Sequence, residues 1–224
     1  MPKSERDTES YRIFDAFDAI RIINLPERKD RRREMEAELA KVNLLGDPRV
    51  RFFDAIKPAD RGDFTSIGAH GVYQSHKLLL NEAASNGQSL LILEDDCDFE
   101  GDMDAAVSSE SWDIFYGGYN AKNPSDLVNS DIEMAHMMGF SARGAQLVSE
   151  YLDNLEYEGI HPPIDAAYIW YRRAHPETPT HFAVPPIGVQ RSSASDIAPR
   201  PWDRFGPTRM LARGLRKLRA RTRG

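Results

Sequence analysis

Four acidic side chains follow a short apolar run in the middle of the chain. Residues 89–93 read SLLIL, and directly after them come Glu94, Asp95, Asp96 and Asp98. Because side chains alternate along an extended chain, Glu94, Asp96 and Asp98 are expected to share one side. Asp95 is expected to face the other side, unless the strand bends at its end. Carboxylates this close repel one another, and a bound divalent cation would relieve that repulsion.

The acidic cluster suits a magnesium or manganese ion. All-oxygen ligands favour Mg²⁺ or Mn²⁺ over zinc, and such an ion can stabilise a diphosphate as a leaving group. We predict Asp96 and Asp98 as the metal ligands, with Asp95 as the alternative partner. The competing interpretation is a solvated acidic turn, since short acidic clusters are common. The apolar strand before the cluster favours a site, because α/β sheets bind ligands outside the carboxyl ends of their strands.

The elements that would position this cluster alternate between strands and helices. Strands are expected over residues 20–25, 50–56, 89–93, 113–116, 136–140 and 181–184. Helices are expected over residues 27–42, 67–85, 142–155 and 164–173. This alternation predicts an α/β fold with a mostly parallel central sheet. We expect a flexible leader over residues 1–17, a catalytic domain over 18–200 and a basic tail over 201–224.

Composition and charge exclude several classes of protein. The 224 residues carry a net charge of −6, and residues 207–224 hold seven basic and no acidic side chains, which leaves −13 on the rest. An acidic body of this kind argues against binding to nucleic acid. No apolar run reaches the roughly 18 residues of a membrane span, and the first residues lack the apolar region of a secretory signal. With Cys97 as the single cysteine, we expect a cytoplasmic protein without an intrachain disulfide.

Several short segments together resemble glycosyltransferase family 25, which includes lipopolysaccharide-biosynthesis enzymes and collagen galactosyltransferases. In chain order they are Ile23-Asn24-Leu25 with Arg28, Asp30, Arg31 and Arg32; GAHGVYQSH at 68–76; LILEDDCDF at 91–99; AHMMGFSARGA at 135–145 with Pro163-Ile164-Asp165; and Val189-Gln190 with Ser195-Asp196-Ile197. The chain departs from the family pattern at Ala69 and Val72, where the family has Glu and Cys, and at His70, which replaces an apolar residue.

The resemblance implies a GT-A-like, Rossmann-type fold and an inverting, metal-dependent sugar transfer. Its donor would be a UDP-sugar, most often UDP-galactose, and its acceptor a hydroxyl of a lipopolysaccharide or other glycan. Two alternatives stay open, a Mg²⁺-dependent phosphotransferase or phosphohydrolase and a catalytically inactive, membrane-associated relative. No Gly-rich GKS/T phosphate loop is present in the sequence, which argues against a nucleotide triphosphatase.

The expected donor contacts lie at strand ends, on the second helix and in the acidic cluster. They are Asn24, Leu25, Arg28, Arg31, Asp54, Ser75, Glu94, Asp95 and Gln190. For Arg31 and its neighbour Arg32 the alternative is an exposed, charged helix face, and we favour that alternative for Arg32. Asp54 is expected to bind ribose hydroxyls or to cap a turn.

An inverting transfer also needs a general base for the acceptor hydroxyl. Asp165, which precedes an apolar helix, is the preferred candidate, and Asp196 in a Ser-rich loop is the competing one. The resemblance adds His76 as a catalytic candidate, although a lone helical histidine is often a hydrogen-bonded structural residue.

The basic tail admits two interpretations. Its apolar residues could form one face of a basic amphipathic helix that binds an anionic membrane surface, where a lipid-linked acceptor would lie. Alternatively the tail is a disordered basic segment, because Gly206, Pro207 and Gly214 weaken a helix. The first interpretation would place a cytoplasmic protein on the inner membrane.

Overall fold

A computed structural model of the chain describes residues 12–104, 106 and 111–191. The order of its elements is a 3-10 helix over Arg12–Ala16, β1 (Ala19–Asn24), α1 (Lys29–Lys41), β2 (Val50–Asp54), α2 (Ile67–Asn86), β3 (Leu90–Glu94), β4 (Cys97–Phe99), β5 (Ile114–Ala121), β6 (Ile132–Phe140), α3 (Ala142–Asp153), α4 (Ile164–Ala174), β7 (Thr180–Phe182) and β8 (Gly188–Gln190). Among the described residues, no helix is both long and apolar enough to span a membrane.

Six strands form one sheet in the order β2-β1-β3-β6-β5-β7. The pairs β1–β2, β1–β3 and β5–β7 are parallel, and β6 pairs antiparallel with both of its neighbours. Only β6 therefore runs against the other five strands, which confirms the expected α/β fold with a mostly parallel sheet. The carboxyl ends of β1, β2 and β3 meet at one edge, where Ile23 pairs with Glu94 and Asn24 with Asp54.

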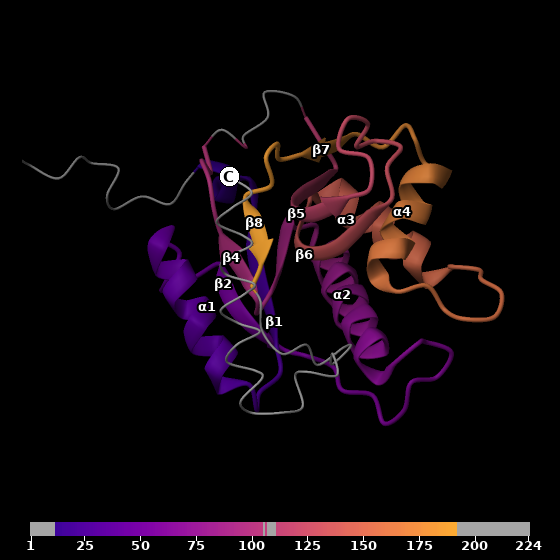
Figure 1. Ribbon diagram of the computed structural model, residues 1–224, viewed down its shortest axis with the longest axis horizontal. Coiled ribbons are helices and arrows are strands. Elements are labelled where there is room, and N and C mark those ends of the chain that lie inside the picture. The colour runs from indigo at the N-terminus through magenta and orange to yellow at the C-terminus, as the bar shows by residue number, and fades with distance from the viewer. Residues whose placement is uncertain (1–11, 105, 107–110, 192–224) are drawn as a thin grey trace, which may run out of the picture.

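Both faces of the sheet are covered, and β3 shows how its sequence allows this. Leu90 and Ile92 belong to a core that includes side chains of α2, α3 and α4, whereas Leu91 and Leu93 belong to a core that includes side chains of α1. In Figure 1 α1 lies on one side of the sheet and α2, α3 and α4 on the other. A strand buried on both faces is apolar throughout, as SLLIL indicates.

Helix α2 is fixed at both ends and pressed against the segment after β2. The Ser66 hydroxyl accepts a hydrogen bond from the Ala69 amide at 3.0 Å and caps the amino end. Gly87 ends the helix in the left-handed conformation at a φ of 62°. A Cβ on Gly71 would lie 2.4 Å from the Ile56 carbonyl oxygen. Only glycine therefore lets the helix approach the segment that follows β2.

The end of the expected leader is part of the core. Ile13, Phe14 and Phe17 are at most 2% exposed, and Arg49 donates from Nη1 to the carbonyls of Phe14 at 2.9 Å and Phe17 at 3.3 Å. The expected flexible leader is therefore wrong for residues 12–17, because their apolar side chains have a buried surface to cover. Residues 1–11 and the expected tail, 201–224, lie outside the described residues.

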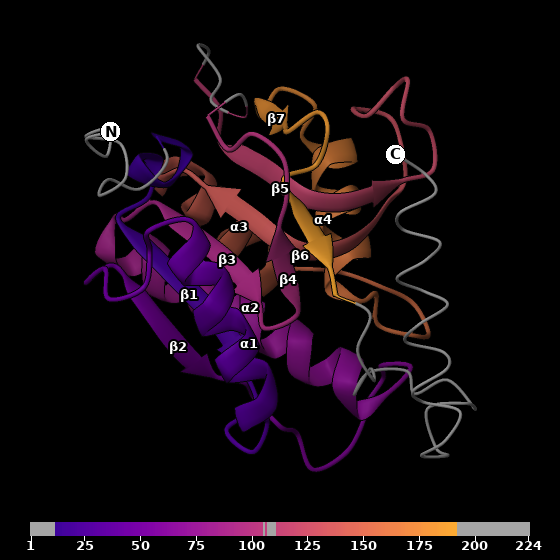
Figure 2. The ribbon, with the colours of Figure 1, turned by 60° about the vertical axis from the view of Figure 1, so that its left-hand side comes forward.

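A short two-stranded ribbon was not expected from the sequence. The chain turns at Asp95 and Asp96, and β4 then pairs antiparallel with β8, with Cys97 opposite Gln190 and Phe99 opposite Gly188. Cys97 and Phe99 pack in the core shared with α1, and Figure 2 shows the ribbon as a separate layer over the sheet. The expected side-chain alternation from 94 to 98 is wrong because this turn interrupts it.

Candidate active site

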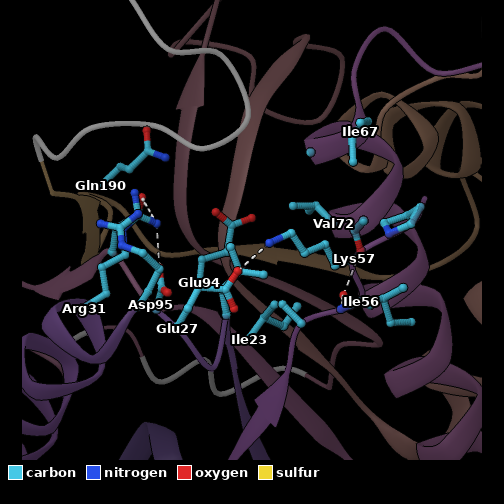
Figure 3. Close-up of a pocket in the computed structure, with 18 residues that line it drawn as sticks. Ile23, Glu27, Arg31, Ile56, Lys57, Ile67, Val72, Glu94, Asp95 and Gln190 are labelled. Carbon is cyan, nitrogen blue, oxygen red and sulfur yellow. Dashed lines mark hydrogen bonds and ion pairs between the residues drawn. The ribbon is translucent and has the colours of Figure 1, made fainter. Parts of the chain in front are cut away.

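A pocket of about 340 Å³ lies at the carboxyl ends of β1 and β3, against the amino-terminal half of α2. Figure 3 shows Arg31, Asp95 and Gln190 on one side of it, and Ile67 and Val72 of α2 on the other. We refer to this cavity as the donor-side pocket. Its position outside the carboxyl ends of parallel strands is the usual ligand position in an open α/β sheet.

Asp95 is held by two partners on the wall of the donor-side pocket. Arg31 Nη1 lies 2.7 Å from Asp95 Oδ1, and Asn24 Nδ2 donates to Asp95 Oδ2 at 2.7 Å. Burial raises the pKa of Asp95, while Arg31 and Asn24 counteract this rise. Arg31 and Asp95 are 8% and 6% exposed. Both oxygens of this buried carboxylate therefore have a hydrogen-bond partner, one of them charged.

Asp96, the next residue, is less well satisfied. It is 6% exposed and lines the donor-side pocket, and its Oδ2 lies 3.5 Å from Arg31 Nη1. Its Oδ1 is buried without a hydrogen-bond partner among the described residues. Burial, Glu94 and Asp95 together raise the pKa of Asp96 to about 7. A cation near Oδ1 would supply the missing partner and offset this negative charge.

Asp98 lies apart from that pocket. Arg191, which follows β8, donates from Nε to Asp98 Oδ1 at 2.8 Å, contacts the same oxygen through Nη2, and pairs with Glu34 at 3.0 Å. Burial raises the pKa of Asp98, and Arg191 counteracts this rise. Asp98 lines neither of the two pockets described here. The structure therefore does not bring Asp96 and Asp98 together at the pocket, because β4 carries Asp98 to Arg191.

Glu94 ends β3 in front of a buried histidine and tyrosine. His76 Nε2 lies 3.9 Å from Glu94 Oε1, and His76 Nδ1 lies 3.0 Å from the Tyr168 hydroxyl. Both rings are at most 1% exposed. Burial raises the pKa of Glu94, but His76, His136 and Arg31 outweigh it and lower that pKa below its ordinary value. His76 lines neither pocket, and its link to the pocket walls is its approach to Glu94.

A second cavity of about 460 Å³ adjoins the first. The two cavities share Val72, Glu94 and Gln190, and we refer to this one as the second pocket. Asp165, in the first turn of α4, lines it and accepts from the Met134 amide at 3.2 Å. The competing acid, Asp196, lies outside the described residues.

Of the other residues expected to contact the donor, some line the donor-side pocket and one lies outside both pockets. Leu25, Arg28 and Ser75 line the donor-side pocket, and the Ser75 hydroxyl accepts from the Ile56 amide at 2.9 Å. Asp54 is exposed at the end of β2 and lines neither pocket.

Sequence reasoning missed several residues of the site. Lys57 is in the wall of the donor-side pocket and pairs with Glu27 at 2.6 Å. Its position just after a strand end was the only available signal. Tyr168 of α4 bonds His76, which lies 3.9 Å from Glu94, and His136 of β6 helps to lower the pKa of Glu94. In the sequence, both are indistinguishable from ordinary buried residues of an apolar helix and strand.

No family model and no curated protein matches this chain. It is similar to the crystal structure of a glycosyltransferase involved in the glycosylation of the major capsid of PBCV-1, at 11% identity over 79% of this chain and 94% of that one, with a TM-score of 0.48. It is also similar to a putative glucose-1-phosphate thymidylyltransferase from Bacillus anthracis in complex with a sucrose, at 13% identity over 74% and 67% of the two chains, with a TM-score of 0.43. At these values the likenesses carry no argument about the fold or the activity of this chain.

Proposed function

We propose that the protein is an inverting glycosyltransferase that moves a sugar from a nucleoside diphosphate sugar to a hydroxyl of a glycan. The observation that carries the proposal is the pair of adjoining pockets at the carboxyl edge of the sheet, with Glu94 in the wall of both. A transfer reaction needs two substrates to meet at one point, and the shared wall provides such a point.

The wall of the donor-side pocket holds three cations that suit a diphosphate, beside four carboxylates from Glu27, Glu94, Asp95 and Asp96. The cations are Arg28, Arg31 and Lys57, and guanidinium and ammonium groups are the usual protein partners of phosphate oxygens. Arg31 is fixed by Asp95 at 2.7 Å, so its position is set before a ligand binds. Arg28 is similarly oriented by Asp30 at 3.0 Å. These cations would hold the diphosphate and stabilise the charge that it gains on leaving.

A divalent cation fits this site if Asp96 and Glu94, rather than Asp98, hold it. Asp96 Oδ1 is buried without a hydrogen-bond partner in the described part of the chain, and Glu94 is a further carboxylate in the same pocket wall whose charge raises the pKa of Asp96. The described residues contain no group of three or more His, Cys, Asp or Glu that could enclose a metal. Mg²⁺ and Mn²⁺ are commonly held by one or two carboxylates together with substrate phosphates and water. When bound, such an ion would supply charge stabilisation to the leaving diphosphate.

Asp165 is the acid that we assign to proton removal. It lines the second pocket, where an acceptor hydroxyl would lie next to the bound donor. Its Oδ1 and Oδ2 accept from the backbone amides of Ala166 and Met134 at 2.9 and 3.2 Å, which fixes the direction of the carboxylate. In the proposed reaction Asp165 takes the hydroxyl proton while the acceptor oxygen attacks the anomeric carbon.

The finer identity of the enzyme rests on the sequence resemblance. We propose membership of glycosyltransferase family 25, a UDP-sugar donor with galactose as its sugar, and a lipopolysaccharide or other glycan as the acceptor. In this proposal the protein is cytoplasmic, and its basic tail binds the anionic surface of the inner membrane. A lipid-linked acceptor would lie at that surface.

Calorimetric titration with nucleoside diphosphates tests the donor site. UDP is expected to bind in the presence of Mn²⁺, and Lys57→Glu is expected to weaken binding at least tenfold, because it places a negative charge in the pocket wall. The matched control is Lys122→Glu, an exposed lysine outside both pockets. Release of phosphate from simple phosphoesters without sugar transfer would favour the phosphohydrolase, and absence of metal-stimulated UDP binding would favour the inactive relative.

A further inference from the structure

The second pocket differs from the donor-side pocket in its charge. Three carboxylates line it, from Glu94, Glu133 and Asp165. Among the described residues its wall contains no lysine, arginine or histidine. One cation outside the wall, Lys122, approaches Glu133 at 3.8 Å. The donor-side pocket also has carboxylates in its wall, from Glu27, Glu94, Asp95 and Asp96, but three cations accompany them there.

We infer that the second pocket binds an uncharged sugar unit as the accepting residue of the glycan and excludes sugar units that themselves carry a phosphate or carboxylate. This inference rests on the proposed function and specifies its second substrate. Carboxylates accept hydrogen bonds from sugar hydroxyls, whereas an anionic group would be repelled by three like charges without a cation in the described wall to pair with it.

Apolar groups in the same pocket match the other side of a sugar ring. Ala69, Val72, Ala135, Pro163 and Ile164 line the pocket alongside the carboxylates. A pyranose presents C–H groups on its faces and hydroxyls around its rim, so a wall with both kinds of group suits it. The volume of about 460 Å³ falls within the range of small-molecule sites.

Met134 contributes to both the acidic and the apolar parts of the second pocket. Its backbone has a φ of 70°, in the left-handed region that a long side chain rarely adopts. Its amide donates to Asp165 Oδ2 at 3.2 Å, and its side chain, 39% exposed, lines the pocket. Backbone strain of this kind gathers at ligand sites. Here the amide of the strained residue donates to Asp165, the proposed base, and its apolar side chain is available to contact the acceptor.

The test compares the binding of matched methyl glycosides by saturation-transfer NMR, with and without UDP and Mn²⁺. Neutral methyl hexosides are expected to bind about tenfold or more tightly than the corresponding uronates and phosphorylated sugars. Glu133→Lys, an exposed position, is expected to remove most of that discrimination. Glu150→Lys, on an exposed position of α3 outside both pockets, is the matched control and should leave it unchanged.

A second variant separates the pocket from the general surface charge. Met134→Gly permits the same φ without strain, so the fold should persist while the apolar contact to the sugar is lost and neutral glycosides bind several-fold more weakly. Equal binding of neutral and anionic sugars, or discrimination that Glu133→Lys leaves intact, would overturn the inference. Binding of neutral sugars without any turnover of a nucleotide sugar would instead support this pocket and count against the proposed transfer.

Discussion

Replacing Asp96 by asparagine should stabilise the metal-free protein, which makes this residue a sharp test of the site. The pKa of Asp96 is about 7 in the fold against an ordinary value of 3.8. Each pKa unit corresponds to about 1.4 kcal/mol, so ionised Asp96 costs the folded state up to about 4 kcal/mol. The attraction of Arg31 is already included, because it lowers the same pKa.

The sign of the effect depends on pH. Between about pH 4 and pH 7 the folded state keeps a proton on Asp96 that the unfolded chain has released, so this group lowers stability as pH rises. Asp96→Asn cannot ionise. It should therefore match the wild type near pH 4 and exceed its free energy of unfolding by about 2–4 kcal/mol at pH 8.

Urea denaturation in the presence of EDTA, from pH 4 to pH 8, measures this difference directly. Asp54→Asn, at an exposed strand end outside both pockets, serves as the control and should differ little from the wild type throughout. Mn²⁺ with UDP should stabilise the wild type but not Asp96→Asn. A difference between Asp96→Asn and the wild type that stays constant with pH, or a variant that is less stable at pH 8, would refute the reasoning.

Three further substitutions test other parts of the site and its support. Arg31→Met should cost about 3–5 kcal/mol of stability in denaturant titrations, because it leaves a buried carboxylate without its cation. Arg32→Met, at an exposed position where the arginine pairs with Glu36 and lies over the Phe52 ring, should cost at most about 1 kcal/mol. Tyr168→Phe should cost about 1–3 kcal/mol by removing the hydroxyl that bonds His76, and should lower kcat more than donor affinity; a change in donor affinity alone would contradict the placement behind Glu94. Gly144→Ala should lower stability by about 1–3 kcal/mol in thermal unfolding although alanine favours helices, because its Cβ would lie 1.9 Å from a carbonyl oxygen.

Much of the sheet could be predicted because its strands carry strong local signals. The run at 89–93 is apolar on both faces and becomes β3, and the helix expected over residues 67–85 becomes α2. The position of Glu94 and Asp95 at the edge of the sheet follows from the same run. Local patterns of this kind depend on a few neighbouring residues, which the sequence shows directly.

Which carboxylates of the acidic cluster line the pocket could not be predicted. Their positions depend on the turn at Asp95 and Asp96 and on the pairing of β4 with β8. These are two three-residue strands that lie about 90 residues apart in the sequence. That pairing places Asp98 beside Arg191 rather than in the pocket. The buried residues of the 3-10 helix were missed for a similar reason. A few apolar side chains in a polar segment do not show by themselves that they are buried, because their burial depends on a core formed by distant residues.

The most direct test of the central claim is the product of the reaction with a UDP-sugar, Mn²⁺ and a neutral methyl glycoside, followed by NMR at the anomeric protons. We predict a new glycosidic bond whose anomeric configuration is opposite to that of the donor, and loss of this product in Asp165→Asn with UDP binding retained. A product with retained configuration, or no sugar transfer from any nucleotide sugar to any neutral acceptor while UDP and Mn²⁺ are bound, would contradict the account.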